Sequence, residues 1–426
     1  MIRLLHAWRR AAIVLAVLAG VLAPAGPMPA QAADAPAPLL GKDRPVTWWF
    51  VYKFNSQTFD QCGPDEDTED RDCRFGGKPG GYRNTQQYVF ASSDKSSFTK
   101  SDGCAGTADP VASTFDQIYS GKFRYLVWND QFYKEPRVHA CSGNSCPSPW
   151  GHSKGILAWN DEGEGVIVQV TTPAWPGIAA KKFKRKSGNT LGCIVKPNNI
   201  KNAQHFFALK LSKKDVVSVL DALKNASVVT DTARLELVNN GGPEDISSKV
   251  EELGVKDDSV ELKQFQLDSG ALLFSKPSGL HVPPWQMLSS ALGSVDLKAA
   301  TWWAFPQIPT TTSSRKIACW DDSLAKPGAV EIAVTGQWDK TEIGLVGGQN
   351  HGKIGVSTSG TKTLSIFADL NQQGTLKGKC ASSQNGRGGL FFVLNDPGLF
   401  KDMTTLLDGE VASTVAPKKK IKVKDE

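Results

Sequence analysis

The motif His-x-Lys occurs twice in the chain, nearly two hundred residues apart, and each copy leads into an apolar stretch typical of a strand. His152 and Lys154 lie in GHSKG (151–155), and His351 and Lys353 lie in NHGKI (350–354). Side chains at positions i and i+2 of a strand point to the same face, so each copy presents an imidazole beside an ammonium group. If both copies serve one site, the two halves of the chain have to fold together at these motifs.

Two converging His-x-Lys pairs suit the transfer of a phosphoryl group. One imidazole can attack and the other can donate a proton, while two lysines offset the negative charge on the phosphate oxygens. A single His-x-Lys is more often part of a surface strand than a catalyst. Two copies at corresponding places favour a catalytic role for His152, Lys154, His351 and Lys353.

The first half predicts strands with a few helices between them. We expect strands at residues 46–54, 88–91, 125–128, 155–159 and 165–172, and helices near residues 114–119 and 213–224. A polar stretch at 229–262, with Asn-Asn-Gly-Gly-Pro at 239–243, predicts a boundary between two lobes.

The second half predicts strands at residues 271–274, 301–305, 330–334, 353–356 and 364–368, and a helix at 285–291. Mixed strands and helices in both halves favour an α/β fold over an all-β sandwich. WWF (48–50) has a faint echo in WWAF (302–305), and each is followed by a His-x-Lys entering a strand. This suggests two related lobes that share one site.

The N-terminus has the composition of a secretory signal peptide. Three arginines precede an apolar run at 11–22, and small residues follow up to Ala32. The apolar run is too short to cross a bilayer, and no later segment reaches the eighteen apolar residues that a membrane helix needs. We therefore expect an exported protein, periplasmic or secreted, with no membrane partner.

The expected organisation follows from these segments. It comprises a signal peptide at 1–32, a Pro-Ala linker at 33–45, an N-terminal lobe with the first motif at 46–240, a C-terminal lobe with the second motif at 241–415, and a basic disordered tail at 416–426. About 390 mature residues exceed what one hydrophobic core usually serves. The sequence is compatible with a monomer or a homodimer.

All eight cysteines lie after the leader, and an even number in an exported chain predicts disulfides. Cys319 and Cys380 are the only two after residue 200, so we expect them to pair. Cys141 and Cys146 are close enough to close a small loop. The first six are expected to pair among themselves, and the remaining four of them are Cys62, Cys73, Cys104 and Cys193.

The net charge does not by itself indicate a polyanionic partner. It is +6 for the whole chain, but three leader arginines and the lysine-rich tail account for it. A local basic run after the first motif could contact a DNA backbone, although such runs are more often solvated loops. Its members are Lys181, Lys182, Lys184, Arg185 and Lys186.

Three further residues are candidates for supporting roles. Asp369 and Asn371 follow an expected strand, where a carboxylate could orient a catalytic imidazole; a turn or cap is an equal alternative. Asn129, with Asp130 beside it, presents the same two alternatives. The chain shows no Cys/His zinc spacing, no phosphate-binding GxxxxGK and no clustered carboxylates of a two-metal nuclease. We therefore expect neither a metal nor a cofactor.

Several segments together resemble the deoxyribonuclease II family, in family order over nearly the whole mature chain. They are WWFVYKFN (48–55), YLVWNDQ (125–131), GHSKG, VTTPAWP (170–176), SSALG (289–293), the second His-x-Lys, ADLNQ (368–372) and NGRGG (385–389). The resemblance implies a phospholipase D-like fold of two pseudo-symmetric lobes. It also implies a metal-independent acid endonuclease that acts on DNA, leaves 3′-phosphate ends and uses the four His-x-Lys residues.

The second motif departs from the usual family pattern. Asn350, Gly352 and Ile354 stand where the family usually has Asp, Ser and Trp. Phospholipase D enzymes carry an acidic residue soon after each motif, whereas Trp159 and Thr358 stand there in this chain, which argues against lipid cleavage. The alternatives are another phosphodiesterase of the same superfamily, acting on RNA or lipid, and an inactive exported DNA-binding protein.

Overall fold

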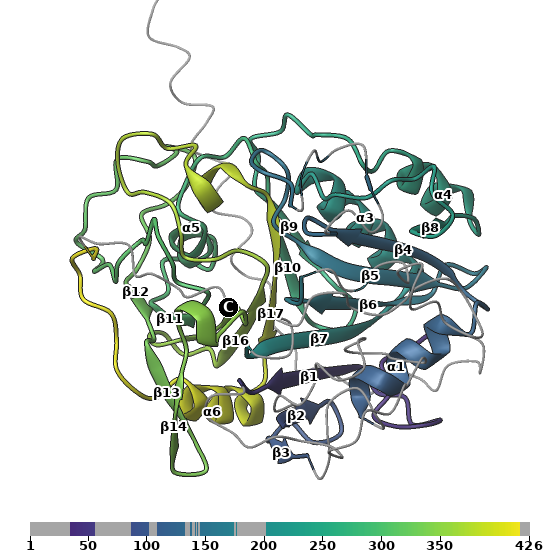
Figure 1. The fold of residues 1–426 in the computed structure, drawn as a ribbon, viewed down its shortest axis with the longest axis horizontal. Coiled ribbons are helices and arrows are strands. Elements are labelled where there is room, and N and C mark those ends of the chain that lie inside the picture. Colours follow the sequence, from purple (N-terminus) through teal and green to yellow (C-terminus); the bar gives the residue numbers. More distant parts are fainter. Residues whose placement is uncertain are drawn as a thin grey trace, which may run out of the picture.

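The computed structural model describes residues 35–55, 87–101, 109–132, 137–138, 141, 143, 145–173, 176 and 202–417. Within them the chain forms two large sheets, which lie beside each other in Figure 1, the first in purple to teal and the second in green to yellow. The α/β class expected from the sequence is confirmed. The signal peptide, the basic run at 181–186 and residues 418–426 of the tail lie outside the described residues.

The first sheet has the strand order β3-β2-β1-β7-β6-β5-β4-β8 and is antiparallel throughout. Its strands are β1 (Trp48–Lys53), β2 (Tyr88–Ser92), β3 (Thr99–Lys100), β4 (Arg124–Asn129), β5 (Lys154–Trp159), β6 (Gly165–Val170), β7 (Gln204–Leu211) and β8 (Val238–Asn239). Helices α1 (Pro110–Tyr119), α3 (Lys213–Asn225) and α4 (Glu244–Glu251) accompany it. Asp109 caps α1, and a Ser212–Asp215 capping box begins α3.

The second sheet has the order β12-β11-β15-β16-β17-β10-β9 and is antiparallel except for the pair β11–β12. Its strands are β9 (Lys263–Gln266), β10 (Leu272–Lys276), β11 (Leu297–Ala300), β12 (Val330–Ile332), β15 (Ile354–Ser357), β16 (Leu364–Ala368) and β17 (Gly389–Asn395). Helices α5 (Pro284–Ala291) and α6 (Pro397–Leu406), the hairpin β13 (Thr335–Trp338)–β14 (Thr341–Gly344), and the 3₁₀ turns η1 (Gly347–Gln349) and η2 (Ser383–Gly386) complete this half.

The central strands of the two sheets follow the same order. In the first sheet it is β1-β7-β6-β5-β4, and in the second it is β10-β17-β16-β15-β11. In the first half α1 precedes β4 and α3 follows β7, and in the second half α5 precedes β11 and α6 follows β17. Each His-x-Lys therefore leads into the corresponding strand of its own sheet, β5 or β15.

Strand β1 is buried on both faces along its whole length, and it is apolar except at its end, where Lys53 stands. On one face, the Trp49 indole donates to the Thr114 hydroxyl of α1 at 3.0 Å. On the other face, Phe50 packs against Phe367 of the second sheet with ring centroids 4.8 Å apart, and the Tyr52 hydroxyl donates to the Asn350 side chain at 3.3 Å. The strand thus joins the first sheet to the second.

Aromatic side chains fill the contact between the sheets. Phe207 of β7 stacks on Phe367 of β16 with centroids 4.3 Å apart, and it also contacts Phe392 of β17. One hydrophobic core therefore includes residues of both sheets. A second core lies around Trp285 and Leu288 of α5. The shared core fixes the relative position of the two motifs that flank it.

Most of the expected elements are confirmed within a few residues, but the strand expected at 301–305 is wrong. The strand of this region is β11, which ends at Ala300. Trp302 instead faces the His351 ring, and Trp303 donates its indole N–H to the Ile308 carbonyl at 2.7 Å. Tertiary contacts of the two tryptophans override their β-propensity. The structural correspondence suggested between WWF and WWAF is therefore also wrong, because β10 takes the position in the second sheet that β1 has in the first.

Other elements that were not expected from the sequence include the long strands β7 and β17, the helices α4 and α6, and the shorter elements β3, β8, β9, β13, β14, η1 and η2. Residues 35–45, expected as a linker, lie against α1: the Ala37 and Leu39 backbone N–H groups donate to Gln117 and Thr114. The chain passes to the second sheet after α4, which packs on α3.

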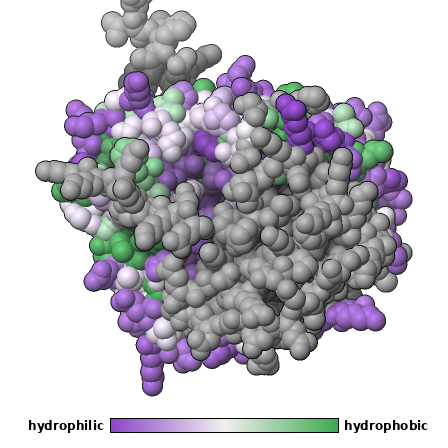
Figure 2. Space-filling view, in the orientation of Figure 1, coloured by the Kyte–Doolittle hydropathy of each residue, from purple (hydrophilic) through white to green (hydrophobic). Residues whose placement is uncertain are grey.

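Both disulfides expected in the described residues are present. Cys319 pairs with Cys380 and Cys141 pairs with Cys146, with Cα atoms 5.2 Å and 4.9 Å apart. The other four cysteines lie outside the described residues. Hydrophilic residues predominate over much of the described surface in Figure 2, with apolar ones scattered among them. None of the described helices combines the length and apolar content needed to cross a membrane.

The two disulfides predict unequal losses of stability. Cys319 and Cys380 are 61 residues apart, whereas Cys141 and Cys146 are 5 apart. Chain-entropy arguments give roughly 4 kcal/mol for the long loop and roughly 2 kcal/mol for the short one. Replacing each pair by serine should therefore lower the melting temperature more for Cys319/Cys380, measured by calorimetry. Equal losses would contradict this account.

Candidate active site

The backbone of the first motif is held from two directions. The Gly151 N–H donates to the Ser227 carbonyl, just after α3, at 2.9 Å, and the His152 N–H donates to the Gly388 carbonyl, just before β17, at 2.8 Å. A side chain at position 151 would collide with the Ala226 carbonyl, so this approach requires glycine. The loop that carries His152 is thereby attached to the second sheet just before β5 begins at Lys154.

The His152 ring directs Nδ1 toward the carbonyl oxygen of Asp369, 2.8 Å away and just after β16. A carbonyl oxygen only accepts, so Nδ1 carries the hydrogen and Nε2 of the neutral ring keeps its lone pair. Burial, followed by the charge of Lys154, lowers the pKa of His152 well below its usual range. A neutral ring with an available Nε2 can act as a base or a nucleophile.

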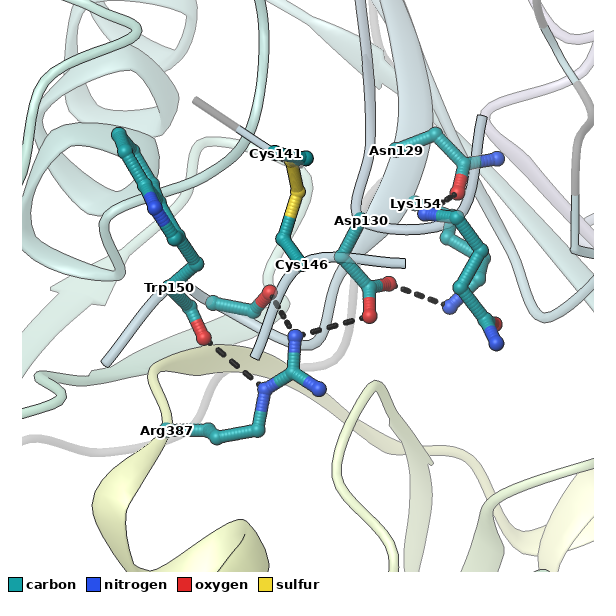
Figure 3. Close-up of a disulfide and its surroundings, with 9 residues drawn as sticks. Asn129, Asp130, Cys141, Cys146, Trp150, Lys154 and Arg387 are labelled. Carbon is teal, nitrogen blue, oxygen red and sulfur yellow. Dashed lines mark hydrogen bonds and ion pairs between the residues drawn. A yellow bond between two sulfur atoms is a disulfide. The ribbon is translucent and has the colours of Figure 1, made fainter. Parts of the chain in front are cut away.

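Lys154 belongs to a buried group of three charges, shown in Figure 3. Its Nζ donates to Asp130 Oδ1 at 2.6 Å, and Nη2 of Arg387 donates to Asp130 Oδ2 at 2.8 Å. Burial would raise the pKa of Asp130, but Lys154, His152 and Arg387 together hold it well below its usual range. The carboxylate is therefore ionised and fixes the position of Lys154.

The backbone of the second motif is held in the corresponding way. The His351 N–H donates to the Ala203 carbonyl, just before β7, at 2.8 Å, and the neighbouring Asn350 forms a bridge with Ala203. The Lys353 N–H donates to Nδ1 of the buried His205 at 3.1 Å, and its Nζ donates to the His351 carbonyl at 2.6 Å. The second motif is thus attached to the first sheet.

The His351 ring lies among neutral side chains. Asn202 Nδ2 is 3.1 Å from Nε2, and Gln204 Nε2 is 3.3 Å from Nδ1. The Trp302 ring lies 5.1 Å away, centroid to centroid. Burial lowers the pKa of His351 well below its usual range, and Lys353, Lys154 and Lys53 lower it further. This environment differs from the charged surroundings of His152.

The two motifs lie within electrostatic range of each other. The charge of Lys353 lowers the pKa of His152, and the charge of Lys154 lowers the pKa values of His351 and Lys353. Burial is the largest cause of the shift at Lys353, whose pKa falls to about 7. Both sheets therefore contribute an imidazole and an ammonium group to one buried region.

Comparison with protein families identifies the family of the chain. The family model of deoxyribonuclease II matches residues 39–409, which include both sheets and both motifs. The chain belongs to the deoxyribonuclease II family. No individual curated protein matches it.

Membership of the deoxyribonuclease II family indicates a nuclease that hydrolyses DNA, with acid endonuclease activity. Members of this family are typically secreted or lysosomal, and the two disulfides suit an oxidising compartment. Within the described residues, no group of three or more His, Cys, Asp and Glu side chains could hold a metal ion.

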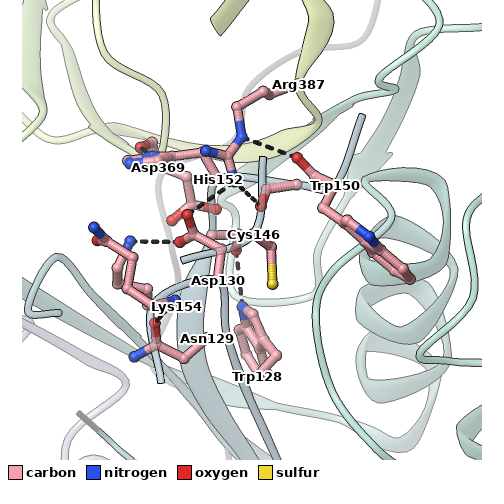
Figure 4. Close-up of polar contacts among 12 residues, drawn as sticks. Trp128, Asn129, Asp130, Cys146, Trp150, His152, Lys154, Asp369 and Arg387 are labelled. Atoms are coloured by element: carbon pink, nitrogen blue, oxygen red, sulfur yellow. Dashed lines mark hydrogen bonds and ion pairs between the residues drawn. The ribbon is translucent and has the colours of Figure 1, made fainter. Parts of the chain in front are cut away.

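Asp369 contacts His152 through its backbone, whereas its carboxylate has other partners (Figure 4). Oδ1 accepts from the Gln169 amide at 3.0 Å, and Oδ2 accepts from the Leu390 N–H at 2.9 Å. Burial raises the pKa of Asp369 to about 7, although hydrogen bonds from Ser153 and Leu390 oppose the rise. The residue therefore orients the imidazole through its carbonyl oxygen, and its carboxylate joins β6 to β17.

Asn129 is the last residue of β4, and Asn371 lies shortly after β16. The Asn371 amide donates to Gln373 at 3.1 Å, and the Asn129 side chain accepts the Gln131 N–H at 2.7 Å. Neither of these contacts touches a motif histidine. The basic residues at 181–186 lie outside the described residues.

Sequence reasoning missed the residues that approach the motifs from the opposite sheet. They are Arg387, Asn202 and Gln204; Trp302, which faces His351 from the same half of the chain, was missed as well. Arg387 lies within the NGRGG segment that carried part of the family resemblance, which was the one available signal. Asn202 and Gln204 stand in a segment with no motif of its own, and Trp302 stands in the WWAF segment, for which the sequence predicts a strand rather than a site.

The raised pKa of Asp369 predicts a pH-dependent effect on stability. The folded-state pKa of about 7 exceeds the unfolded value of about 3.9. The contribution of this group to the free energy of unfolding is therefore fully present below pH ~4, and it is lost as the pH rises through ~7. Asp369→Asn removes this titration. The melting temperature of the variant relative to the wild type should therefore rise between pH 4 and pH 8.

A matched control has the opposite sign. Hydrogen bonds from Ser323 lower the pKa of Asp321, so its contribution is present above the unfolded pKa and is lost as the pH falls. Asp321→Asn should thus lose relative stability with rising pH. A constant difference between Asp369→Asn and the wild type at all pH values would refute the assignment.

Proposed function

We propose that this member of the deoxyribonuclease II family is a metal-independent endonuclease whose catalytic residues are His152, Lys154, His351 and Lys353. It cleaves DNA through a phosphohistidine intermediate and leaves 3′-phosphate ends. The fold in this proposal is phospholipase D-like, with two pseudo-symmetric lobes that form one active site. The common order of the central strands in the two sheets supports this part of the proposal.

The reciprocal attachment of the two motifs carries the proposal. The backbone of His152 bonds to the residue before β17, and that of His351 bonds to the residue before β7. Each imidazole is thus supported by the sheet that bears the other motif. This is the arrangement that a single phosphate would need in order to contact both histidines.

In the first step, Nε2 of one histidine attacks phosphorus and the bond from phosphorus to the 5′ oxygen breaks. The other histidine donates its proton to that oxygen. The upstream fragment, whose 3′ oxygen keeps the phosphorus, remains attached through a bond between nitrogen and phosphorus, and the downstream fragment leaves with a 5′ hydroxyl. The Nδ1–H of His152, held by the Asp369 carbonyl, leaves its Nε2 suitable for either role.

In the second step, the histidine that gave its proton removes one from a water molecule. The resulting hydroxide attacks phosphorus, the bond to nitrogen breaks, and the strand leaves with a 3′-phosphate. Both imidazoles return to their starting protonation states. Lys154 and Lys353 stabilise the charge on the phosphate oxygens in both steps.

DNA is expected to bind mainly through its phosphates. The basic residues Lys181, Lys182, Lys184, Arg185 and Lys186 follow the first motif and are candidates for backbone contacts. Such binding weakens with salt and discriminates little between sequences.

Plasmid nicking tests the proposal directly. The wild type should nick plasmid DNA in excess chelator, and His152→Ala and His351→Ala should each reduce the rate by at least about a thousand-fold, because the two act as one unit. His281→Ala is the control, since this histidine belongs to neither motif. Activity that returns only with Mg²⁺, or that survives either motif substitution, would refute the mechanism. Assays on RNA and phosphatidylcholine test for the alternative substrates.

The lowered pKa of Lys353 predicts a further loss of activity above pH 7, in addition to the loss that deprotonation of the proton-donating histidine causes at lower pH. Its pKa is about 7, so at pH 8 only about a tenth of the molecules retain the ammonium charge. Activity should therefore fall as the pH rises through 7. Lys353→Arg keeps its charge and should extend activity, relative to its own maximum, above pH 7; Lys353→Gln should be weak at every pH. Identical profiles for the wild type and Lys353→Arg would exclude this residue as the limiting group.

A further inference from the structure

Arg387 reaches from the second half of the chain to the backbone that carries His152. Its Nε donates to the Trp150 carbonyl at 2.9 Å, and its Nη2 donates to the Gly151 carbonyl and to Asp130 Oδ2, each at 2.8 Å. The next residue, Gly388, accepts the His152 N–H. Residues 387 and 388 thus form four hydrogen bonds with the first motif and its carboxylate partner.

The loop that carries Arg387 is itself firmly held. The buried Lys276, at the end of β10, donates to the carbonyls of Asn385 and Arg387 at 2.8 and 3.0 Å. The Ser148 hydroxyl donates to the Gly386 carbonyl at 2.6 Å. A side chain at Gly388 would collide with the Ala226 carbonyl, so the loop fits closely against the end of α3. Arg387 therefore acts from a fixed support.

The contacts of Arg387 bear on both catalytic groups of the first motif. One carboxylate oxygen of Asp130 binds Lys154 and the other binds Arg387 (Figure 4). Arg387 therefore restricts the orientation of the carboxylate that holds Lys154. The carbonyls of residues 150 and 151 are the last two before His152. Loss of the guanidinium would leave these carbonyls and Asp130 Oδ2 without this buried donor.

We propose that Arg387 is a positioning residue of the active site, which orients Lys154 through Asp130 and orients His152 through the carbonyls of Trp150 and Gly151. The guanidinium is required because one planar group has to serve two carbonyls and a carboxylate. The catalytic part of this inference rests on the proposed function. The geometric part concerns the conformation of the free protein.

The pKa of His152 gives a second way to test the position of Arg387. The groups that face His152 are Lys154, Asp130, Arg387 and Lys353, and the Asp369 carbonyl holds its ring. Among these, Arg387 lowers the pKa of His152 after burial and Lys154 have done so. Removing its charge should raise that pKa, whereas an arginine that does not lie beside the motif in solution would leave it unchanged.

The kinetic test compares Arg387→Lys and Arg387→Gln with a matched control. Arg234 has similar partners away from the site, the Asp231 carboxylate at 3.2 Å and the Arg137 carbonyl at 2.9 Å, so Arg234→Lys serves as the control. Both Arg387 variants should lower kcat by about 10- to 100-fold with KM nearly unchanged, because misplaced catalytic groups slow the chemistry. The control should retain kcat. A raised KM with normal kcat would make Arg387 a DNA contact and overturn the proposal.

A measurement without substrate separates this proposal from the proposed function. In protein labelled at histidine Cε1, NMR titration should show the His152 pKa raised in Arg387→Gln and unchanged in Arg234→Lys, with His152→Ala identifying the signal. An unchanged His152 signal and pKa in Arg387→Gln would overturn the proposal even in an inactive protein. Absence of nicking by the wild type, together with a shifted His152 pKa, would refute the proposed function and retain the positioning role.

Discussion

Two backbone hydrogen bonds define the centre of this molecule, since each motif histidine donates its N–H to a carbonyl just before a central strand of the other sheet. The acceptors are Gly388 for His152 and Ala203 for His351. Main-chain bonds of this kind depend on the register of the strands rather than on side-chain rotamers. The geometry of the site therefore follows from the docking of the two sheets, because each half supplies part of the support for the motif of the other.

Docking of the sheets also accounts for the apolar interior beside a highly polar site. Phe207, Phe367 and Phe392 pack between the sheets, and aromatic pairs of this kind contribute beyond the area they bury. That contact offsets the cost of removing several ionisable groups from water. The cost remains visible in the pKa values of Lys353 and Asp369, both of which burial shifts to about 7.

Features with a local signal could be predicted from the sequence. The two motifs, strands β5 and β15, helix α3 and the Cys319–Cys380 pair all follow from short segments or simple counts. The partners of the motifs could not, because Arg387 lies 257 positions from Asp130 and only the fold brings them together. The strand predicted at 301–305 is wrong for the same reason, because Trp302 and Trp303 contact tertiary partners that local propensity does not reveal.

The equivalent positions of the two halves explain how one framework gives the two histidines different surroundings. Thr171 follows β6 and Asp369 follows β16, and each side chain accepts the N–H of the second residue of the neighbouring strand, His205 or Leu390. The same backbone bond is therefore made by a hydroxyl in one half and by a carboxyl group in the other. With Asp130 and Arg387 also beside the first motif, charge gathers around His152, while His351 lies among amides and an indole. A common fold thus sets the positions of both imidazoles, and the side chains around them differentiate their protonation.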